Sequence, residues 1–139
     1  MTHTGFIGLG AMGAPMAAHL AQAGQLRMVY NRSPARAEAF AATHGVVAAE
    51  RIEAVARACE VIVICVSNSK AVEAVVDGIE PGLRPGAIVV DSTTADPAMT
   101  RRTGARLAEM GIRMLDAPLG RSPNEAEAGT LSTYVGGDV

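Results

Sequence analysis

Positive charge and long apolar runs are both scarce in this sequence. The 12 Lys and Arg residues are outnumbered by 14 Asp and Glu residues, which gives a formal net charge of -2. Nucleic acids and anionic membranes are therefore not expected as partners, and any anion must bind at a local site. Apolar runs stay below the roughly 18 to 20 residues that a membrane-spanning helix needs, and no charged leader precedes an apolar segment at the N-terminus. We expect no membrane span and no targeting segment.

Cysteine is scarce too, because the chain has only Cys59 and Cys65. Both lie near or within an apolar segment and lack the spacing of metal ligands. The prediction is two buried free thiols, no bound metal and a reducing compartment, the cytoplasm. With 139 residues and 49% hydrophobic content, the chain can bury a core without disulfides or metal. Residues 1–139 are expected to form one domain.

A glycine-rich stretch near the N-terminus carries the strongest signal. Residues 4–20, TGFIGLGAMGAPMAAHL, place Gly8, Gly10 and Gly13 in the pattern G-x-G-x-x-G. The first glycine permits a tight turn, the second lets backbone N–H groups approach phosphates, and the third lets a helix pack closely on a strand. A pyrophosphate then lies at the helix N-terminus, where unpaired N–H groups and the macrodipole favour negative charge. The stretch predicts a dinucleotide site.

The flanking residues agree with this interpretation. The apolar pair Phe6 and Ile7 precedes the glycines, and apolar residues at helical spacing follow them until Gly24, which can end the helix. The sequence thus predicts a strand, a turn and a helix in that order. The alternative is that the three glycines only make a tight turn.

The second strand and helix bear on the choice of cofactor. A strand is expected over 26–30 and a helix over 35–44, with Asn31, Arg32 and Ser33 in a turn that caps the helix. In NAD-selective sites an acid at the end of this strand accepts a hydrogen bond from the ribose 2′-hydroxyl, whereas a 2′-phosphate needs a cation. Asn31 and Arg32 stand there instead, so NADP is favoured over NAD. The alternative is that Arg32 is a solvated loop side chain.

The remaining segments alternate between helix and strand. Helices are expected over 50–58 and 97–110, the latter capped by Asp96, and strands are expected over 46–47, 60–66, 87–90, 112–116 and 130–135. Strands that alternate with helices predict an α/β fold, a doubly wound parallel sheet of about six or more strands with helices on both faces. No repeat or linker interrupts the pattern.

Polar residues follow two of these strands. Ser67 and neighbouring residues come after the strand over 60–66, and Thr94 belongs to a hydroxyl-rich cluster after the strand over 87–90. Ligands of open parallel sheets bind at such strand ends. Lys70, the only lysine, follows at a helix start. It could act as a general acid or base if its pKa were depressed, but no group nearby in the sequence would depress it, and an exposed helix lysine is the plainer alternative.

Four blocks of the chain resemble one family: GFIGLGAMGAPMAAHL, VYNRSP, VDSTT and LDAPLGRSPNEAEAGTLSTYVGG. They look like the N-terminal half of the β-hydroxyacid dehydrogenases, which include 3-hydroxyisobutyrate dehydrogenase, tartronate semialdehyde reductase and the NADP-binding domain of 6-phosphogluconate dehydrogenase. The resemblance covers nearly the whole chain. It implies a Rossmann-like domain that binds NADP and a small anionic substrate, in an enzyme that is a homo-oligomer in its full-length form.

The resemblance also implies which residues bind the cofactor. The glycine turn would hold the pyrophosphate, the turn after the second strand would surround the adenosine ribose and its 2′-phosphate, and two later strand ends would lie near the cofactor. The implied set is Gly8, Leu9, Gly10, Ala11, Met12, Gly13, Asn31, Arg32, Ser33, Val66, Ser67 and Thr94.

The segment over 117–129 carries the implied substrate residues. The family commonly reads D-A-P-V-S-G-G here, and its last three residues line the substrate; this chain has Gly120, Arg121 and Ser122. That departure resembles the subgroup with G-R-[ST], which includes sulfolactaldehyde reductases. Arg can fork two N–H groups onto an anion, so an anionic substrate tail is implied. The alternative is an exposed loop arginine.

The family's catalytic lysine lies on a motif like G-x-x-G-x-G-x-x-x-K, beyond the position of Val139, and a helical C-terminal domain completes the family's cleft. No catalytic residue is therefore predicted within this chain, which alone is expected to be inactive and is either a fragment or a standalone domain. Two functions stay open. One is the cofactor half of an enzyme that transfers a hydride between NADP and a short 3-hydroxy acid or semialdehyde; the other is a noncatalytic NADP-binding or sensing module. The Arg121 loop favours the first.

Overall fold

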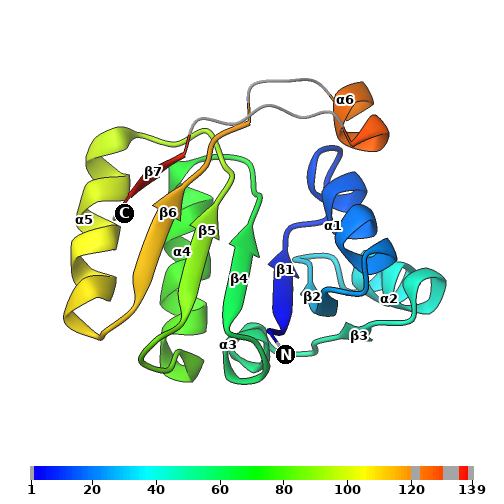
Figure 1. The fold of residues 1–139 in the computed structure, drawn as a ribbon, viewed down its shortest axis with the longest axis horizontal. Helices are drawn as coiled ribbons and strands as arrows, with labels where there is room; N and C mark the ends of the chain where they lie inside the picture. Colours follow the sequence, from blue (N-terminus) through cyan, green and yellow to red (C-terminus); the bar gives the residue numbers. More distant parts are fainter. Residues whose placement is uncertain (1, 120–122, 130–134, 138–139) are drawn as a thin grey trace.

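The computed structural model describes residues 2–119, 123–129 and 135–137, and it places seven strands in one sheet in the order β3-β2-β1-β4-β5-β6-β7 (Figure 1). The strands are β1 (Thr4–Ile7), β2 (Leu26–Tyr30), β3 (Val47–Ala48), β4 (Val61–Ile64), β5 (Ile88–Asp91), β6 (Arg113–Asp116) and β7 (Gly136–Gly137). The helices are α1 (Gly13–Gln22), α2 (Pro34–His44), α3 (Ile52–Ala58), α4 (Ser69–Ile79), α5 (Pro97–Glu109) and α6 (Pro123–Ala128), with a 3-10 turn at Glu80–Gly82. The pairs from β3 to β6 are all parallel, and β7 runs antiparallel to β6.

This architecture confirms the predicted doubly wound sheet. Side chains alternate between its two faces as a pleated strand requires: Phe6 belongs to the cluster under α1 and α2, whereas the adjacent Ile7 belongs to the cluster under α3, α4 and α5. Both residues are almost fully buried. Because both faces are covered, the strands are apolar nearly throughout, which is why they were readable from the sequence.

Two elements differ from the prediction. The segment over 117–129 was expected as a loop, but it contains α6, where Pro123 occupies a helix start and is followed by good helix formers. Ala126 of this helix is buried, and Figure 1 shows α6 beside α1, with which it is in contact. The final strand lies at Gly136–Gly137, just after the strand predicted over 130–135. Val135 is not part of a strand, and residues 130–134 lie outside the described residues.

The turns predicted to precede α5 and α2 are both present, but only the first provides a side-chain cap. Asp96 precedes α5, and its carboxylate accepts a hydrogen bond from the Ala98 backbone N–H at 3.2 Å, as predicted. Ser33 occupies the corresponding position before α2, but its side chain makes no capping hydrogen bond. Pro34 occupies the first turn there and has no backbone N–H to satisfy, which reduces the need for a side-chain cap. Within the described part of the chain, no helix is long and apolar enough to cross a membrane.

Candidate dinucleotide-binding site

The strand order creates a crevice at the carboxyl ends of β1 and β4. The chain leaves β1 toward β2 and β3 on one side and returns to pair β4 on the other side, so the connections diverge at this point. Such switch points are where open α/β sheets bind ligands. A cleft of about 880 Å³ opens here, and it is lined by the glycine turn and by the ends of β2, β4 and β5.

The three glycines occupy different environments in the walls of this cleft. Gly8 has a φ of 104°, and a Cβ there would lie 2.0 Å from the carbonyl oxygen of Cys65. A Cβ on Gly13 would lie 1.9 Å from the carbonyl oxygen of Gly8. Gly8 and Gly13 are thus fixed by the fold itself, since any side chain would collide with backbone. A Cβ on Gly10 would meet no atom within 4 Å, so its missing side chain leaves room in the cleft rather than in the core.

The start of α1 adds hydrogen-bond donors to the same wall. Met12 precedes the helix and provides no side-chain cap. The backbone N–H groups of Gly10, Ala11, Met12 and Gly13 have no hydrogen-bond partner within the part of the chain that the structure describes. Unpaired donors at a helix N-terminus attract anions. The open space at Gly10 and these donors together fit the pyrophosphate of a dinucleotide.

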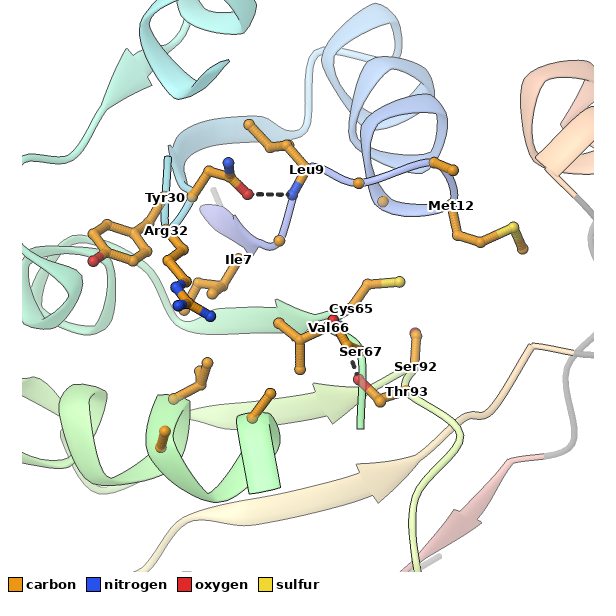
Figure 2. Close-up of a pocket in the computed structure, with 18 of the residues that line it drawn as sticks. Ile7, Leu9, Met12, Tyr30, Arg32, Cys65, Val66, Ser67, Ser92 and Thr93 are labelled. Atoms are coloured by element: carbon orange, nitrogen blue, oxygen red, sulfur yellow. Dashed lines mark hydrogen bonds between the residues drawn. The ribbon is translucent and has the colours of Figure 1, made fainter. Parts of the chain in front are cut away.

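The turn after β2 holds the glycine turn in place. The Leu9 backbone N–H donates to Asn31 Oδ1 at 2.9 Å, and the Arg36 guanidinium donates to the Leu9 carbonyl oxygen at 3.2 Å. Asn31 also donates through Nδ2 to the Ser33 carbonyl oxygen at 3.2 Å. Figure 2 shows the Arg32 side chain reaching into the cleft beside Tyr30. Arg32 and Arg36, both exposed, therefore line the end of the cleft next to β2. The described residues that line the cleft include no Asp or Glu.

The ends of β4 and β5 form the other end of the cleft, and Figure 2 shows the hydrogen bond that joins Val66 to Thr93 there. The Val66 backbone N–H donates to Thr93 Oγ1 at 3.0 Å, and the Thr93 backbone N–H donates to Asp91 Oδ1 at 2.9 Å. Thr93 is buried, whereas Thr94 is exposed at the rim. These contacts fix two cleft-lining loops against each other.

Burial shifts the titration of several groups near this end. It raises the pKa of Asp91, although the hydrogen bond from the Thr93 N–H partly offsets the rise. Burial also raises the pKa of Asp116, the residue that pairs with Asp91 on β6. The pKa of the half-buried Cys65 thiol rises to about 11 for the same reason. The thiol is thus protonated and poorly nucleophilic at neutral pH.

Eleven of the twelve predicted cofactor residues line the cleft, and Ser33 does not. The eleven are Gly8, Leu9, Gly10, Ala11, Met12, Gly13, Asn31, Arg32, Val66, Ser67 and Thr94. Their roles stay predictions. Lys70 is exposed and is not among the residues that line the cleft. The predicted substrate residues Gly120, Arg121 and Ser122 lie outside the described residues, while Leu119 before them lines the cleft.

Sequence reasoning missed two residues that the geometry brings into this site. Arg36 lies on α2 whereas Arg32 lies in the turn before it, so the spacing rule for side chains on one helix does not connect the two and gave no signal. Thr93 lies in the hydroxyl cluster from which only Thr94 was selected, and the sequence offered no signal to prefer one over the other. In the described ranges, no group of three or more His, Cys, Asp and Glu side chains could hold a metal ion.

Comparison with known proteins identifies the family. The sequence profile of the NAD binding domain of 6-phosphogluconate dehydrogenase matches residues 3–139. The chain belongs to this family, as a nucleotide-binding domain of the β-hydroxyacid dehydrogenase type. The resemblance drawn from the four sequence blocks is thereby confirmed.

Three relatives illustrate the match. The NAD-dependent L-serine dehydrogenase of Pseudomonas aeruginosa is 36% identical over 142 residues, which cover 100% of this chain and 47% of that protein. The structure of Mycobacterium tuberculosis 3-hydroxyisobutyrate dehydrogenase with L-serine superposes with a TM-score of 0.92 at 32% identity, covering 99% of this chain and 47% of that one. The structure of Psf3 in complex with NADP+ and 2-OPP gives a TM-score of 0.88 at 33% identity, covering 97% and 49%. The chain spans about half the length of these relatives.

Proposed function

We propose that this chain binds NADP(H) in the cleft between β1 and β4 and serves as the cofactor domain of a β-hydroxyacid dehydrogenase. The observation that carries the proposal is that the three glycines differ in the space that surrounds them. Gly8 and Gly13 are required by the fold, but Gly10 is required by nothing in the protein and faces open space. Beside it stand the unpaired N–H groups of the α1 start. A glycine kept free at this place fits the close approach of a pyrophosphate.

The end of the cleft at β2 supports NADP over NAD. Arg32 and Arg36 both line it, and the position at which an NAD-selective site has an acid is held by Asn31. The Asn31 side chain already accepts from Leu9 N–H and donates to the Ser33 carbonyl, so it serves the loop. A guanidinium is well suited to a phosphate because its N–H groups can form two parallel charge-assisted hydrogen bonds. We assign Arg32 as the principal 2′-phosphate ligand, assisted by Arg36. Relatives differ on this point, since one is named NAD-dependent and another was solved with NADP+.

The opposite end of the cleft would receive the nicotinamide and, next to it, the substrate. When bound, NADPH supplies a hydride for reduction of a carbonyl, or NADP+ accepts one in the reverse direction. Val66, Ser67, Thr93 and Thr94 come from this end, and Leu119, two positions before Arg121 in the sequence, also lines the cleft. Arg121, with Gly120 and Ser122, would hold the anionic tail of a short 3-hydroxy acid or its semialdehyde, so that its reacting carbon is oriented toward the cofactor.

The proton donor is expected from the family's lysine motif, beyond the position of Val139, so the 139-residue chain should bind cofactor without turnover. The complete enzyme is expected to be a cytoplasmic homo-oligomer. Arg121→Ala in that enzyme should lower kcat/KM by about 10² for anionic substrates, on the cost of removing a charged partner, and should leave uncharged aldehydes nearly unaffected. An equal loss for both substrate classes would assign Arg121 to loop structure instead.

The cofactor proposal itself is tested with Gly10→Val. Because a Cβ at this position meets no protein atom within 4 Å, the variant should keep its thermal stability. Its side chain would fill the space assigned to the pyrophosphate, so NADPH affinity in a fluorescence titration should fall at least about tenfold, or 1.4 kcal/mol. Gly104→Val is the matched control, because Gly104 also faces open space but lies on α5 away from the cleft. Unchanged NADPH binding by Gly10→Val would contradict the proposal.

A further inference from the structure

A buried carboxyl group lies directly behind the cleft and belongs to no part of the function proposed above. Asp91 ends β5 and is 0% exposed. Its Oδ1 accepts from the Thr93 N–H at 2.9 Å, and its backbone oxygen accepts from the Ala117 N–H at 2.7 Å. Its Oδ2 is buried and has no hydrogen-bond partner among the described residues. Buried polar atoms without a partner are rare because they cost stability, so their retention calls for a reason.

Asp91 is connected to the cleft through Thr93. Thr93 Oγ1 accepts from the Val66 N–H at 3.0 Å, and both Thr93 and Val66 line the cleft, whereas Asp91 does not. The carboxyl group therefore fixes the Thr93 backbone, and the Thr93 hydroxyl fixes the backbone after β4. This chain of contacts joins two loops from neighbouring strands at the wall of the cleft. The same loops are also joined outside it, since the Ser92 N–H donates to the Ile64 carbonyl oxygen at 2.8 Å and the Asp96 N–H donates to Ser69 Oγ at 2.7 Å.

We propose that Asp91 is a positioning residue for the nicotinamide half of the cofactor, acting through Thr93 on the Val66 backbone. The inference rests on the proposed NADP(H) function and divides the cleft into two parts. The glycine turn and the arginines bind the adenosine and pyrophosphate of the cofactor, and Asp91 shapes the part that receives the nicotinamide. Removing Asp91 should therefore weaken only those contacts that a ligand makes beyond its pyrophosphate.

The surroundings of Asp91 favour an uncharged carboxyl group in this role. Asp116 pairs with it from β6 and adds negative charge, and no basic side chain makes an ion pair with it in the described part of the chain. Burial raises the pKa of Asp91, and the charge of Asp116 acts in the same direction. An amide has the same shape, accepts the same hydrogen bond from the Thr93 N–H and carries no charge. Asp91→Asn should thus retain the positioning, whereas Asp91→Ala should lose it.

The experiment compares two ligands of the 139-residue chain by calorimetry. NADPH carries the nicotinamide, and 2′-phospho-ADP-ribose is the same molecule without it. The dissociation constant of 2′-phospho-ADP-ribose divided by that of NADPH is the factor by which the nicotinamide tightens binding. Asp91→Ala should reduce this ratio by about five- to tenfold, as expected for loss of a buried hydrogen bond, with the affinity for 2′-phospho-ADP-ribose unchanged. Asp91→Asn should restore the ratio, which a general loss of stability would not permit.

Two further variants keep the test decisive. Thr93→Val removes the hydroxyl that holds Val66 and should lower the ratio as Asp91→Ala does, and it carries the test if Asp91→Ala does not fold. Thr103→Val removes another buried hydroxyl, which contacts Met99 on α5 away from the cleft, and should leave the ratio unchanged.

The outcomes separate this inference from the function on which it rests. If neither ligand binds the unmodified chain, the proposed function is wrong and the role of Asp91 falls with it. If both bind but the ratio is the same in Asp91→Ala and Thr93→Val as in the unmodified chain, the cofactor assignment stands and the positioning role is overturned. A drop in affinity for both ligands by the same factor would also overturn it, because the effect would then be on the whole cleft.

Discussion

The backbone N–H of Leu9 donates to the side-chain oxygen of Asn31 at 2.9 Å, which joins the glycine turn after β1 to the end of β2. Arg36 holds the carbonyl oxygen of the same residue at 3.2 Å. Leu9 itself is almost fully buried. The turn is thus held from both sides of one peptide, by residues that arrive more than twenty positions later in the chain. A turn fixed before the ligand arrives saves the entropy of ordering it on binding.

The Asn31 contact leads to a first prediction. Asn31→Ala should weaken NADPH and NADH alike, by about 1 kcal/mol, because the Leu9 N–H loses its acceptor and the turn is less well ordered. Asn31→Asp should instead keep an acceptor for Leu9 and place a negative charge beside the 2′-position, so that NADPH weakens and NADH does not. Titration of each variant with both cofactors measures the two effects. A uniform loss in Asn31→Asp would show that the charge is too far away to matter.

The two cysteines provide a second prediction, in which each serves as the control for the other. Burial raises the pKa of both thiols to about 11, so alkylation at pH 8 should be slow and should speed up about tenfold per pH unit, since the thiolate is the reactive form. Cys65 lines the cleft and Cys59 does not. Saturating NADPH should therefore slow the alkylation of Cys65, measured by peptide mass spectrometry, and leave Cys59 unaffected. Equal protection of both thiols would indicate general stabilisation rather than binding beside Cys65.

A third prediction concerns the pH dependence of stability. The pKa of Asp91 in the folded chain lies above its ordinary value of 3.8 because of burial, so the folded state holds this proton more tightly than the unfolded state. Linkage then makes the contribution of Asp91 to stability greatest at low pH, and it declines as the pH rises from about 3.8 through the raised folded pKa. Asp116 contributes in the same direction.

Asp91→Asn removes this dependence and tests the sign. Relative to the unmodified chain, the variant should gain stability as the pH rises through that window, because its amide does not ionise whereas the buried carboxyl group must. Urea unfolding at several pH values gives the comparison. If the unmodified chain instead gains stability over Asp91→Asn as the pH rises, Asp91 is a stabilising carboxylate and the burial argument is wrong.

The fold was predictable because local and tertiary preferences agree in this chain. Strands such as β4 (Val61–Ile64) are short, apolar and β-branched, since both faces of the sheet are covered. The exceptions have tertiary causes. The short α6 gains its stability where Ala126 packs into the interior, and β7 consists of Gly136 and Gly137, which carry no strand signal and are ordered by pairing with Asp116 and Leu115. Neither cause is visible in a local window of sequence.

The candidate site was predictable where backbone sterics dictate residue type. Gly8 and Gly13 must lack a Cβ because carbonyl oxygens occupy the space, and such constraints leave a pattern in the sequence. Arg36 and Thr93 left none. The position of Arg36 depends on how α2 leaves β2, and that of Thr93 depends on β4 and β5 lying side by side, so both become evident only once the sheet is assembled.

The most direct test of the central claim is a calorimetric titration of the unmodified chain and of Arg32→Asp with NADPH and NADH. The unmodified chain should bind NADPH more tightly, and Arg32→Asp should weaken NADPH by about 1.5 to 3 kcal/mol through loss of a charge-assisted bond to the 2′-phosphate, with little effect on NADH. Arg101→Asp makes the same charge change at an exposed position on α5, away from the cleft, and should change neither affinity. Equal affinities of the unmodified chain for NADPH and NADH would contradict the NADP assignment, and the absence of binding to either would contradict the site itself.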